Sequence, residues 1–150
     1  MAIDMILSLW MLLGFAGWTV FVLLIGVGVY RWSLILTGRA PIAGFPGDTP
    51  HGSAAYRRAV RAHANCIENL PVFAAIVLVA ACAHVAPAPM GALAVAVLAA
   101  RIVQSSIHML LPETNTTVAL RFSFFFIQIA AMIAMAILLA TALPKIGAAG

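Results

Sequence analysis

The sequence predicts an all-α membrane protein, a single four-transmembrane-helix bundle that covers residues 1–150. Hydrophobic residues fill 65% of the 150 positions and charged residues fill only 8%, and the mean hydropathy is +1.13. A soluble domain averages ~45–50% apolar and ~25% charged residues. The chain therefore has too little polar surface to enclose a soluble core, and four apolar segments are each long enough to form a membrane-spanning helix.

The first apolar segment covers residues 5–36. No basic residue precedes it and it is longer than the core of a signal peptide, so we expect a retained transmembrane helix. A basic loop, residues 37–62, follows. The first half of this loop is rich in Gly and Pro, whereas residues 53–70 contain no helix breaker. Ser53 is therefore the expected N-cap of a helix that enters the membrane near Arg61.

The other three apolar segments follow in quick succession. The second covers residues 66–86, and Pro71 within it is expected to kink the helix. The breaks HVAPAPMG and LPETNTT separate it from the third segment, 90–111, and the third from the fourth, 118–143. Arginines concentrate in loop 37–62, whereas HVAPAPMG has no Lys or Arg. The positive-inside rule then places the first and third loops in the cytoplasm and both termini on the non-cytoplasmic side.

Polar side chains interrupt the apolar helices in ordered rows. Because helical residues advance by ~100° each, Arg61, Asn65 and Glu68 fall within ~60° of one another on one helix face, and Arg57 extends this row by one turn. The third segment carries a similar row, which consists of Arg101, Gln104, Ser105 and His108. Arg121 lies near the start of the fourth segment, so three helices offer polar groups at a similar depth.

These polar groups are costly in hydrocarbon, at a few kcal/mol (~2.5–3.5) for each charge. Glu68, Arg101 and Arg121 should therefore face protein or a water-filled pocket, and the simplest arrangement is one shared site in which Glu68 partners an arginine. Arginines outnumber the carboxylate, so the surplus positive charge predicts a small anionic ligand that carries carboxylates or a thiolate. The alternative is a polar cluster that only holds the helices together.

Other kinds of site find little support in the sequence. Cys66 and Cys82 are expected on one helix, ~24 Å apart, which is too far for a disulfide. No set of His, Cys, Asp and Glu has metal-ligand spacing, so no metal is expected. Nucleotide-binding and Ser-His-Asp signatures are also missing from the sequence, and no nucleic-acid partner is expected.

The run RAHANCIENLPVF, residues 61–73, resembles the helix-two motif of the MAPEG family, membrane-associated proteins in eicosanoid and glutathione metabolism. The resemblance extends over nearly the whole chain. It includes the four spans, the basic first loop, the TGR run at 37–39, and the arginines at positions 101 and 121. It implies a homotrimer of four-helix protomers that binds glutathione between neighbouring subunits, near the cytoplasmic face.

The resemblance also implies roles for individual residues. The residues expected to hold glutathione are Arg61, His63, Asn65, Glu68, Arg101 and His108. Arg121 matches the arginine that lies near the thiol in catalytic members, so it is the expected catalytic residue. Arg57, Gln104 and Arg39 are further candidate contacts. Three positions depart from the family pattern. Ala64 stands where prostaglandin-forming members have a second basic residue, Cys66 replaces the acidic residue usual after the motif asparagine, and His108 falls about where several members carry a tyrosine.

The leading functional hypothesis is a glutathione-dependent membrane transferase or peroxidase that acts on lipophilic electrophiles or lipid hydroperoxides. One alternative is a non-catalytic lipid-binding scaffold of the same fold. Another is a small proton-coupled transporter with Glu68 and His108 as a proton relay. We expect an integral, multi-pass membrane protein, and the Ala-rich composition favours a bacterial inner membrane.

Overall fold

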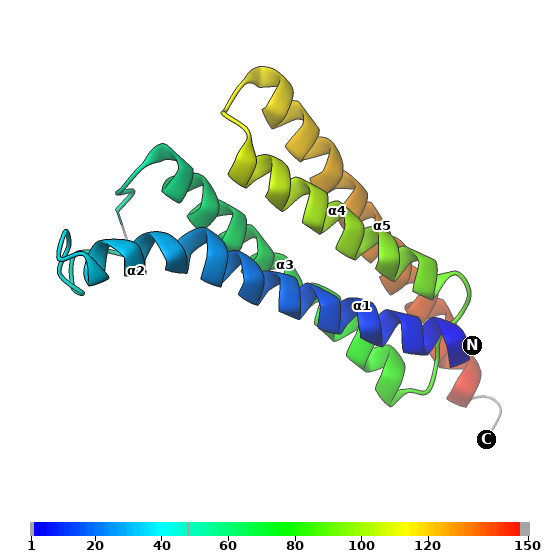
Figure 1. The fold of residues 1–150 in the computed structure, drawn as a ribbon. Coiled ribbons are helices and arrows are strands. Elements are labelled where there is room, and N and C mark those ends of the chain that lie inside the picture. The colour runs from blue at the N-terminus through cyan, green and yellow to red at the C-terminus, as the bar shows by residue number, and fades with distance from the viewer. Residues whose placement is uncertain (1, 48, 148–150) are drawn as a thin grey trace.

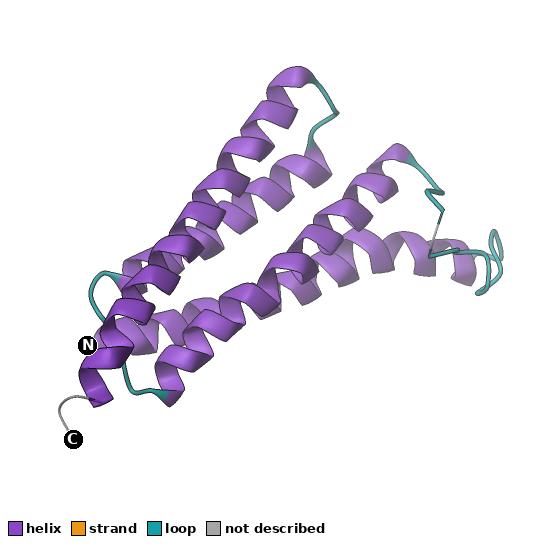
Figure 2. Ribbon diagram, turned by 180° about the vertical axis from the view of Figure 1, so that it is seen from behind, coloured by secondary structure: helices purple, strands orange, loops and turns teal. Residues whose placement is uncertain are grey.

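A computed structural model describes residues 2–47 and 49–147 of the chain. The described residues form helices joined by short connections, without strands (Figures 1 and 2). The helices are α1 (Ala2–Phe21), η1 (Val22–Gly28), α2 (Val29–Leu36), α3 (Ala54–Cys82), α4 (Met90–Leu110) and α5 (Asn115–Gly147). Among these residues four helices are long and apolar enough to cross a membrane: Ala2–Leu36, Ala54–Cys82, Met90–Leu110 and Asn115–Leu143. The predicted four-helix membrane fold is confirmed.

The four spans run up and down, so the start of α1 and the end of α5 lie at the same end of the molecule (Figure 1). The α3–α4 connection lies at this end too. The long α2–α3 loop and the α4–α5 loop lie at the opposite end. This arrangement matches the predicted order of loops, whereas the side of the membrane on which the termini lie stays a prediction.

The first span differs from a regular α-helix. Residues 2–36 form one continuous 35-residue helix, but its middle section, η1, is a seven-residue π-helix. A π-helical turn widens the helix and shifts the register of the side chains that follow it. Gly26 lies in this section, where an added Cβ would lie 3.1 Å from the Cβ of Ala59 and 3.3 Å from the sulfur of Met109. The glycine thus lets the first span approach α3 and α4 closely.

The second span begins earlier and ends earlier than the predicted segment 66–86. Ser53 caps α3 as expected, because its hydroxyl oxygen accepts a hydrogen bond from the backbone N–H of Tyr56 at 3.2 Å. Nine residues of the predicted loop 37–62 therefore belong to the helix. Pro71 lies inside α3 without ending it, and the helix stops at Cys82, after which His84 takes a positive φ of 55°.

The main apolar core lies in the half of the molecule that holds the chain ends. It joins all four spans, for example through Phe15 of α1, Phe73 of α3, Met90 of α4 and Met135 of α5, each fully buried. A second, smaller cluster is built on Val27, Tyr56 and Ala59. The pair of α1 with α3 and the pair of α4 with α5 separate toward the end with the long loop (Figures 1 and 2).

Gly52→Ala is expected to destabilise the α2–α3 loop by about 2–3 kcal/mol. Gly52 has φ +75°, which L-residues rarely adopt, and an added Cβ would lie 2.7 Å from Cδ1 of Tyr56. Thermal unfolding in detergent, followed by circular dichroism, measures the effect. Gly47→Ala is the matched control because no atom lies within 4 Å of its added Cβ. Equal unfolding temperatures for the two variants would contradict this prediction.

Candidate functional site

Arg101 lies at the centre of a buried polar layer. Its side chain is 0% exposed and Nη1 donates a hydrogen bond to the side-chain carbonyl of Gln104. The guanidinium lies over the ring of Phe15, with 5.7 Å between its carbon and the ring centroid. Nε and Nη2 are buried and make no hydrogen bond with the described residues. A buried guanidinium with unused donors is strongly unfavourable unless an anion completes it.

Gln128 lies at the same level as Arg101. The antiparallel helices α4 and α5 are joined by a contact between His108 and Arg121. Arg101 comes seven residues before His108, and Gln128 comes seven residues after Arg121. Two helical turns thus separate each of them from this contact. Gln128 is 0% exposed, and neither end of its amide has a partner among the described residues. The layer therefore holds unused hydrogen-bonding groups on two helices.

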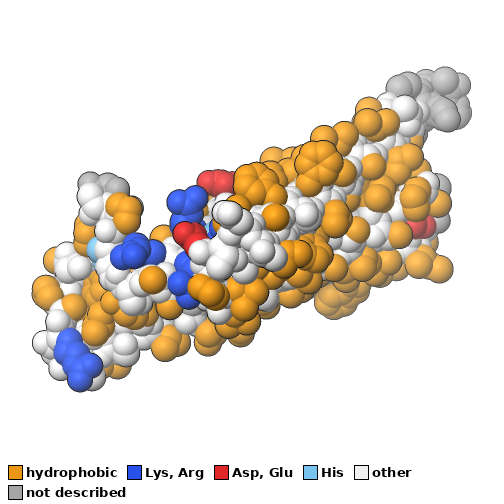
Figure 3. Space-filling model, turned by 90° about the horizontal axis from the view of Figure 1, so that it is seen from above, with side chains coloured by type: hydrophobic (Ala, Val, Ile, Leu, Met, Phe, Trp, Pro, Cys, Tyr) orange, Lys and Arg blue, Asp and Glu red, His pale blue; other side chains and the backbone are white. Residues whose placement is uncertain are grey.

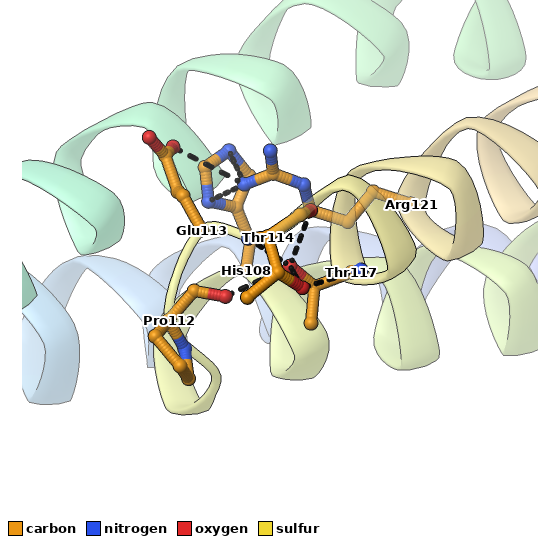
Figure 4. A network of polar contacts seen from close by, with 6 residues as sticks. All are labelled: His108, Pro112, Glu113, Thr114, Thr117 and Arg121. Atoms are coloured by element: carbon orange, nitrogen blue, oxygen red, sulfur yellow. Dashed lines mark hydrogen bonds and ion pairs between the residues drawn. The ribbon is translucent and has the colours of Figure 1, made fainter.

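Arg121, His108 and Glu113 form a second polar group at the end of α4 and the start of α5 (Figure 4). Nη1 of Arg121 lies 3.0 Å from Nδ1 of His108 and 3.5 Å from a carboxylate oxygen of Glu113. Both contacts use Nη1, so Nη2 and Nε make no hydrogen bond with the described residues. The side chain of Arg121 is 15% exposed, and it keeps two donors for a ligand.

The start of α5 is held by its threonines, which fixes Arg121 close to the loop. The hydroxyl of Thr114 accepts a hydrogen bond from the backbone N–H of Thr117 at 3.2 Å, and the hydroxyl of Thr117 donates to the carbonyl of Pro112 at 2.8 Å (Figure 4). These bonds satisfy backbone groups that the first turn of a helix leaves open. The loop that carries Glu113 is thereby tied to the helix that carries Arg121.

The polar row of α3 is not buried together with Arg101. Arg61 and Glu68 are exposed on the protomer, and Asn65 and His63 are partly buried. No ion pair joins Glu68 to an arginine within residues 2–47 and 49–147, so the expected Glu68–arginine pair is wrong for the single chain. The reason is geometric, since α3 buries the face that carries Tyr56, Ala59, Ala62, Cys66 and Phe73. Glu68 still lies within electrostatic range of Arg101.

The candidate residues therefore fall into three groups. Arg101 and Gln104 lie in the buried layer, and His108 and Arg121 are in direct contact at the loop end. Arg61 lies within electrostatic range of His108, so the row of α3 approaches this second group. Arg57 lies at the mouth of a pocket near the loop 37–53. Arg39 is exposed in the turn after α2, and its side chain contacts none of these groups.

Several residues of the site carry no clear sign in the sequence. The thiol of Cys66 lies 3.6 Å from the hydroxyl of Ser105, within the buried layer, although from the sequence Cys66 was considered only as a disulfide partner and as a departure from the family pattern. Phe15 contacts Arg101 from a helix without charges nearby. Glu113 replaces Glu68 as the carboxylate beside an arginine. Only one feature of the sequence pointed to this role of Glu113. The residue lies in the break before the fourth span, close to the start of α5.

The hydrogen-bond donors left unused at the site suit an anion. No group of three or more His, Cys, Asp or Glu side chains that could hold a metal ion occurs in the described part of the chain. Two buried guanidinium donors at Arg101 and two free donors at Arg121 instead suit carboxylate or thiolate groups. The outward row of α3 offers an amide and a carboxylate, which suit the peptide and amino groups of a small peptide.

Three comparisons with known proteins address the family of the chain. The family model described as MAPEG family matches residues 7–141, which includes every residue of the site. Searches of curated proteins and of solved structures gave no match.

Proposed function

The chain belongs to the MAPEG family of membrane proteins of glutathione and eicosanoid metabolism, and from this premise we propose that it binds glutathione and activates its thiol. The activated thiol attacks lipophilic electrophiles or lipid hydroperoxides. The observation that carries the proposal is the buried guanidinium of Arg101, with Nε and Nη2 unsatisfied. A carboxylate of glutathione would complete these donors, as bidentate pairs of arginine and carboxylate do.

The outward row of α3 supports a site completed by a neighbouring subunit. Arg61, Asn65 and Glu68 do not enclose a ligand within one chain, because Arg61 and Glu68 are exposed and Asn65 is only partly buried. We propose that they face a second copy in a homotrimer, and that glutathione bridges them to the arginine-bearing helices. We propose His63 and His108 as further glutathione contacts, while Gln104, Arg57 and Arg39 are candidates for secondary contacts.

Arg121 is the proposed catalytic residue. A free thiol has a pKa of ~8.5, and the thiolate rather than the thiol is the nucleophile. The free donors of Arg121 would stabilise the thiolate, so the bound thiol would release its proton to solvent near neutral pH. With an electrophile, the sulfur forms a bond to carbon while the leaving group departs with its electron pair. With a hydroperoxide, two glutathione molecules are oxidised to the disulfide, and the peroxide becomes an alcohol and water.

A lipophilic second substrate would reach the thiolate from the membrane. Glutathione is soluble and arrives from water, whereas the electrophile or hydroperoxide dissolves in the bilayer and enters between helices. We propose that this division explains a membrane location, with a bacterial inner membrane favoured by the Ala-rich composition.

Turnover assays on the purified protein in lipid nanodiscs test this function. We expect glutathione-dependent consumption of a lipophilic aryl halide or a fatty-acid hydroperoxide, and much slower consumption of a water-soluble analogue of the same reactivity. Empty nanodiscs with glutathione give the uncatalysed rate. A protein that binds lipid but leaves this rate unchanged with all substrates would instead be the non-catalytic scaffold.

A further inference from the structure

A pocket of about 560 Å³ lies at the loop end of the molecule, above the buried polar layer. This volume falls within the ~300–1,000 Å³ typical of small-ligand sites. Its walls come from α2, the loop before α3, the first turns of α3 and the α4–α5 loop. The charged and titratable residues that line it are Arg31, His51, Arg57, Arg58, Arg61 and Glu113. Among the described lining residues, four guanidinium groups thus meet one carboxylate.

Arg31 is held in place by aromatic groups. Its Nε donates a hydrogen bond to the hydroxyl of Tyr56 at 2.6 Å. The carbon of its guanidinium lies 5.4 Å from the ring centroid of Phe45 and 5.8 Å from that of Tyr56. Tyr56 in turn stacks on Tyr30, with the ring centroids 4.4 Å apart. Because these contacts fix Arg31, its remaining donors are presented in a constant position.

An arginine and a histidine of the pocket also have buried nitrogens that lack partners. Nε of Arg58 and Nε2 of His51 are shielded from solvent and form no hydrogen bond with the described residues. Arg57 is oriented by its own hydrogen bond, in which Nη1 donates to the carbonyl of Gly52 at 2.9 Å. The loop is therefore folded around a basic cavity in which hydrogen-bond donors remain unused.

The depth of Arg31 places the pocket beside the lipid headgroups. Asp4 and Arg31 are separated by 27 positions without a charged residue between them, on one continuous helix. At ~1.5 Å per residue the two charges lie ~40 Å apart, which exceeds the ~30 Å hydrocarbon core. Arg31 thus lies beyond the hydrocarbon, where phosphates are found. Lys and Arg side chains gather at this end, and hydrophobic side chains cover much of the flank (Figure 3).

We propose that this pocket binds a phosphate group, and that the headgroup of an anionic membrane phospholipid supplies it. A phosphate accepts several hydrogen bonds at once, which suits the guanidinium groups of Arg31 and Arg58. The acyl chains would lie along the apolar flank of the first span on the hydrocarbon side of Arg31, where Leu24 and Ile25 are 59% and 56% exposed. The pocket shares Arg57 and Arg61 with the proposed thiol site. The proposal rests on Arg31 and Arg58, which do not belong to that site.

Native mass spectrometry of the detergent-solubilised protein tests the proposal. The probes are phosphatidylglycerol and, as the phosphate-free comparison, diacylglycerol with the same acyl chains. We expect the wild-type protein to retain phosphatidylglycerol preferentially, and Arg31→Gln and Arg58→Gln each to weaken this binding about fivefold. Arg39→Gln is the charge-matched control, since Arg39 lies in the turn after α2 but does not line the pocket.

A competition experiment distinguishes a lipid headgroup from a soluble phosphate compound as the source of the phosphate. Displacement of the lipid by millimolar glycerol phosphate would assign the pocket to a soluble phosphate compound and still support a phosphate site. Equal retention of phosphatidylglycerol by all four proteins would overturn the proposal. So would a parallel loss of glutathione binding in Arg31→Gln and Arg58→Gln, because the pocket would then be the entrance to the thiol site. Failure of the glutathione proposal alone would leave these lipid results unchanged.

Discussion

Arg101→Met is expected to weaken glutathione binding about 100-fold while leaving the bundle at least as stable as the wild-type protein. Loss of one partner of a buried, charge-assisted contact typically costs ~2–5 kcal/mol of binding. The unfolding temperature of the free protein should stay the same or rise, because replacing a buried, incompletely paired charge by an apolar residue of similar volume is often neutral or stabilising. Isothermal titration with glutathione and thermal unfolding in detergent measure the two effects.

The opposite signs separate a ligand-binding arginine from a structural one. If Arg101 only holds the helices together, its loss should lower the unfolding temperature, since the hydrogen bond to Gln104 and the contact with Phe15 disappear. Ile102→Met is the matched control, as it places the same side chain at the next position of α4, where Ile102 is only partly buried. A destabilised Arg101→Met variant with normal glutathione affinity would show that the arginine is structural.

Arg121→Ala is expected to reduce the turnover number about 100- to 1,000-fold with little change in the KM for glutathione. Removal of one positioned donor that stabilises a developing anion has an effect of about this size. Binding should persist, because in the proposed complex Arg101 and the row of α3 hold the peptide while Arg121 faces the sulfur. Steady-state kinetics at saturating lipophilic substrate separates the two parameters.

Arg121→Lys provides the informative comparison for this prediction. A lysine retains the charge but lacks the planar set of donors that reaches both Glu113 and a ligand. We expect partial activity, between that of Arg121→Ala and that of the wild-type protein. Turnover that is unchanged in Arg121→Ala would remove this residue from the mechanism, and a large rise in KM alone would make it a binding residue.

The fold could be predicted from the sequence because membrane-spanning helices have a simple sequence pattern. Each span is a long apolar run, and Ser53 marks the start of α3 through a side-chain cap that needs no tertiary context. The π-helical section η1 was not readable. Gly26 in this section lies close to Ala59 and Met109, and such contacts between residues far apart in the sequence leave no local signal.

The site was predictable only in part, for a related reason. Helical spacing shows which residues share a face, and it correctly grouped Arg101 with Gln104. It does not show which face is turned inward, so the row with Glu68 was expected in the interior although it lies on the outer surface of the protomer. Contacts between helices, such as that of Cys66 with Ser105 or of Arg121 with His108, depend on relative rotation and depth, which one sequence does not encode locally.

Ultraviolet difference absorbance on addition of glutathione to the detergent-solubilised protein tests the central claim most directly, since a thiolate absorbs where the thiol does not. The account predicts a saturable thiolate signal at neutral pH, which approaches one per thiol site and is lost when S-methylglutathione replaces glutathione. Glutathione that binds without a thiolate signal, or that does not bind at all, would contradict the claim that the arginines of α4 and α5 form a site for an ionised thiol peptide.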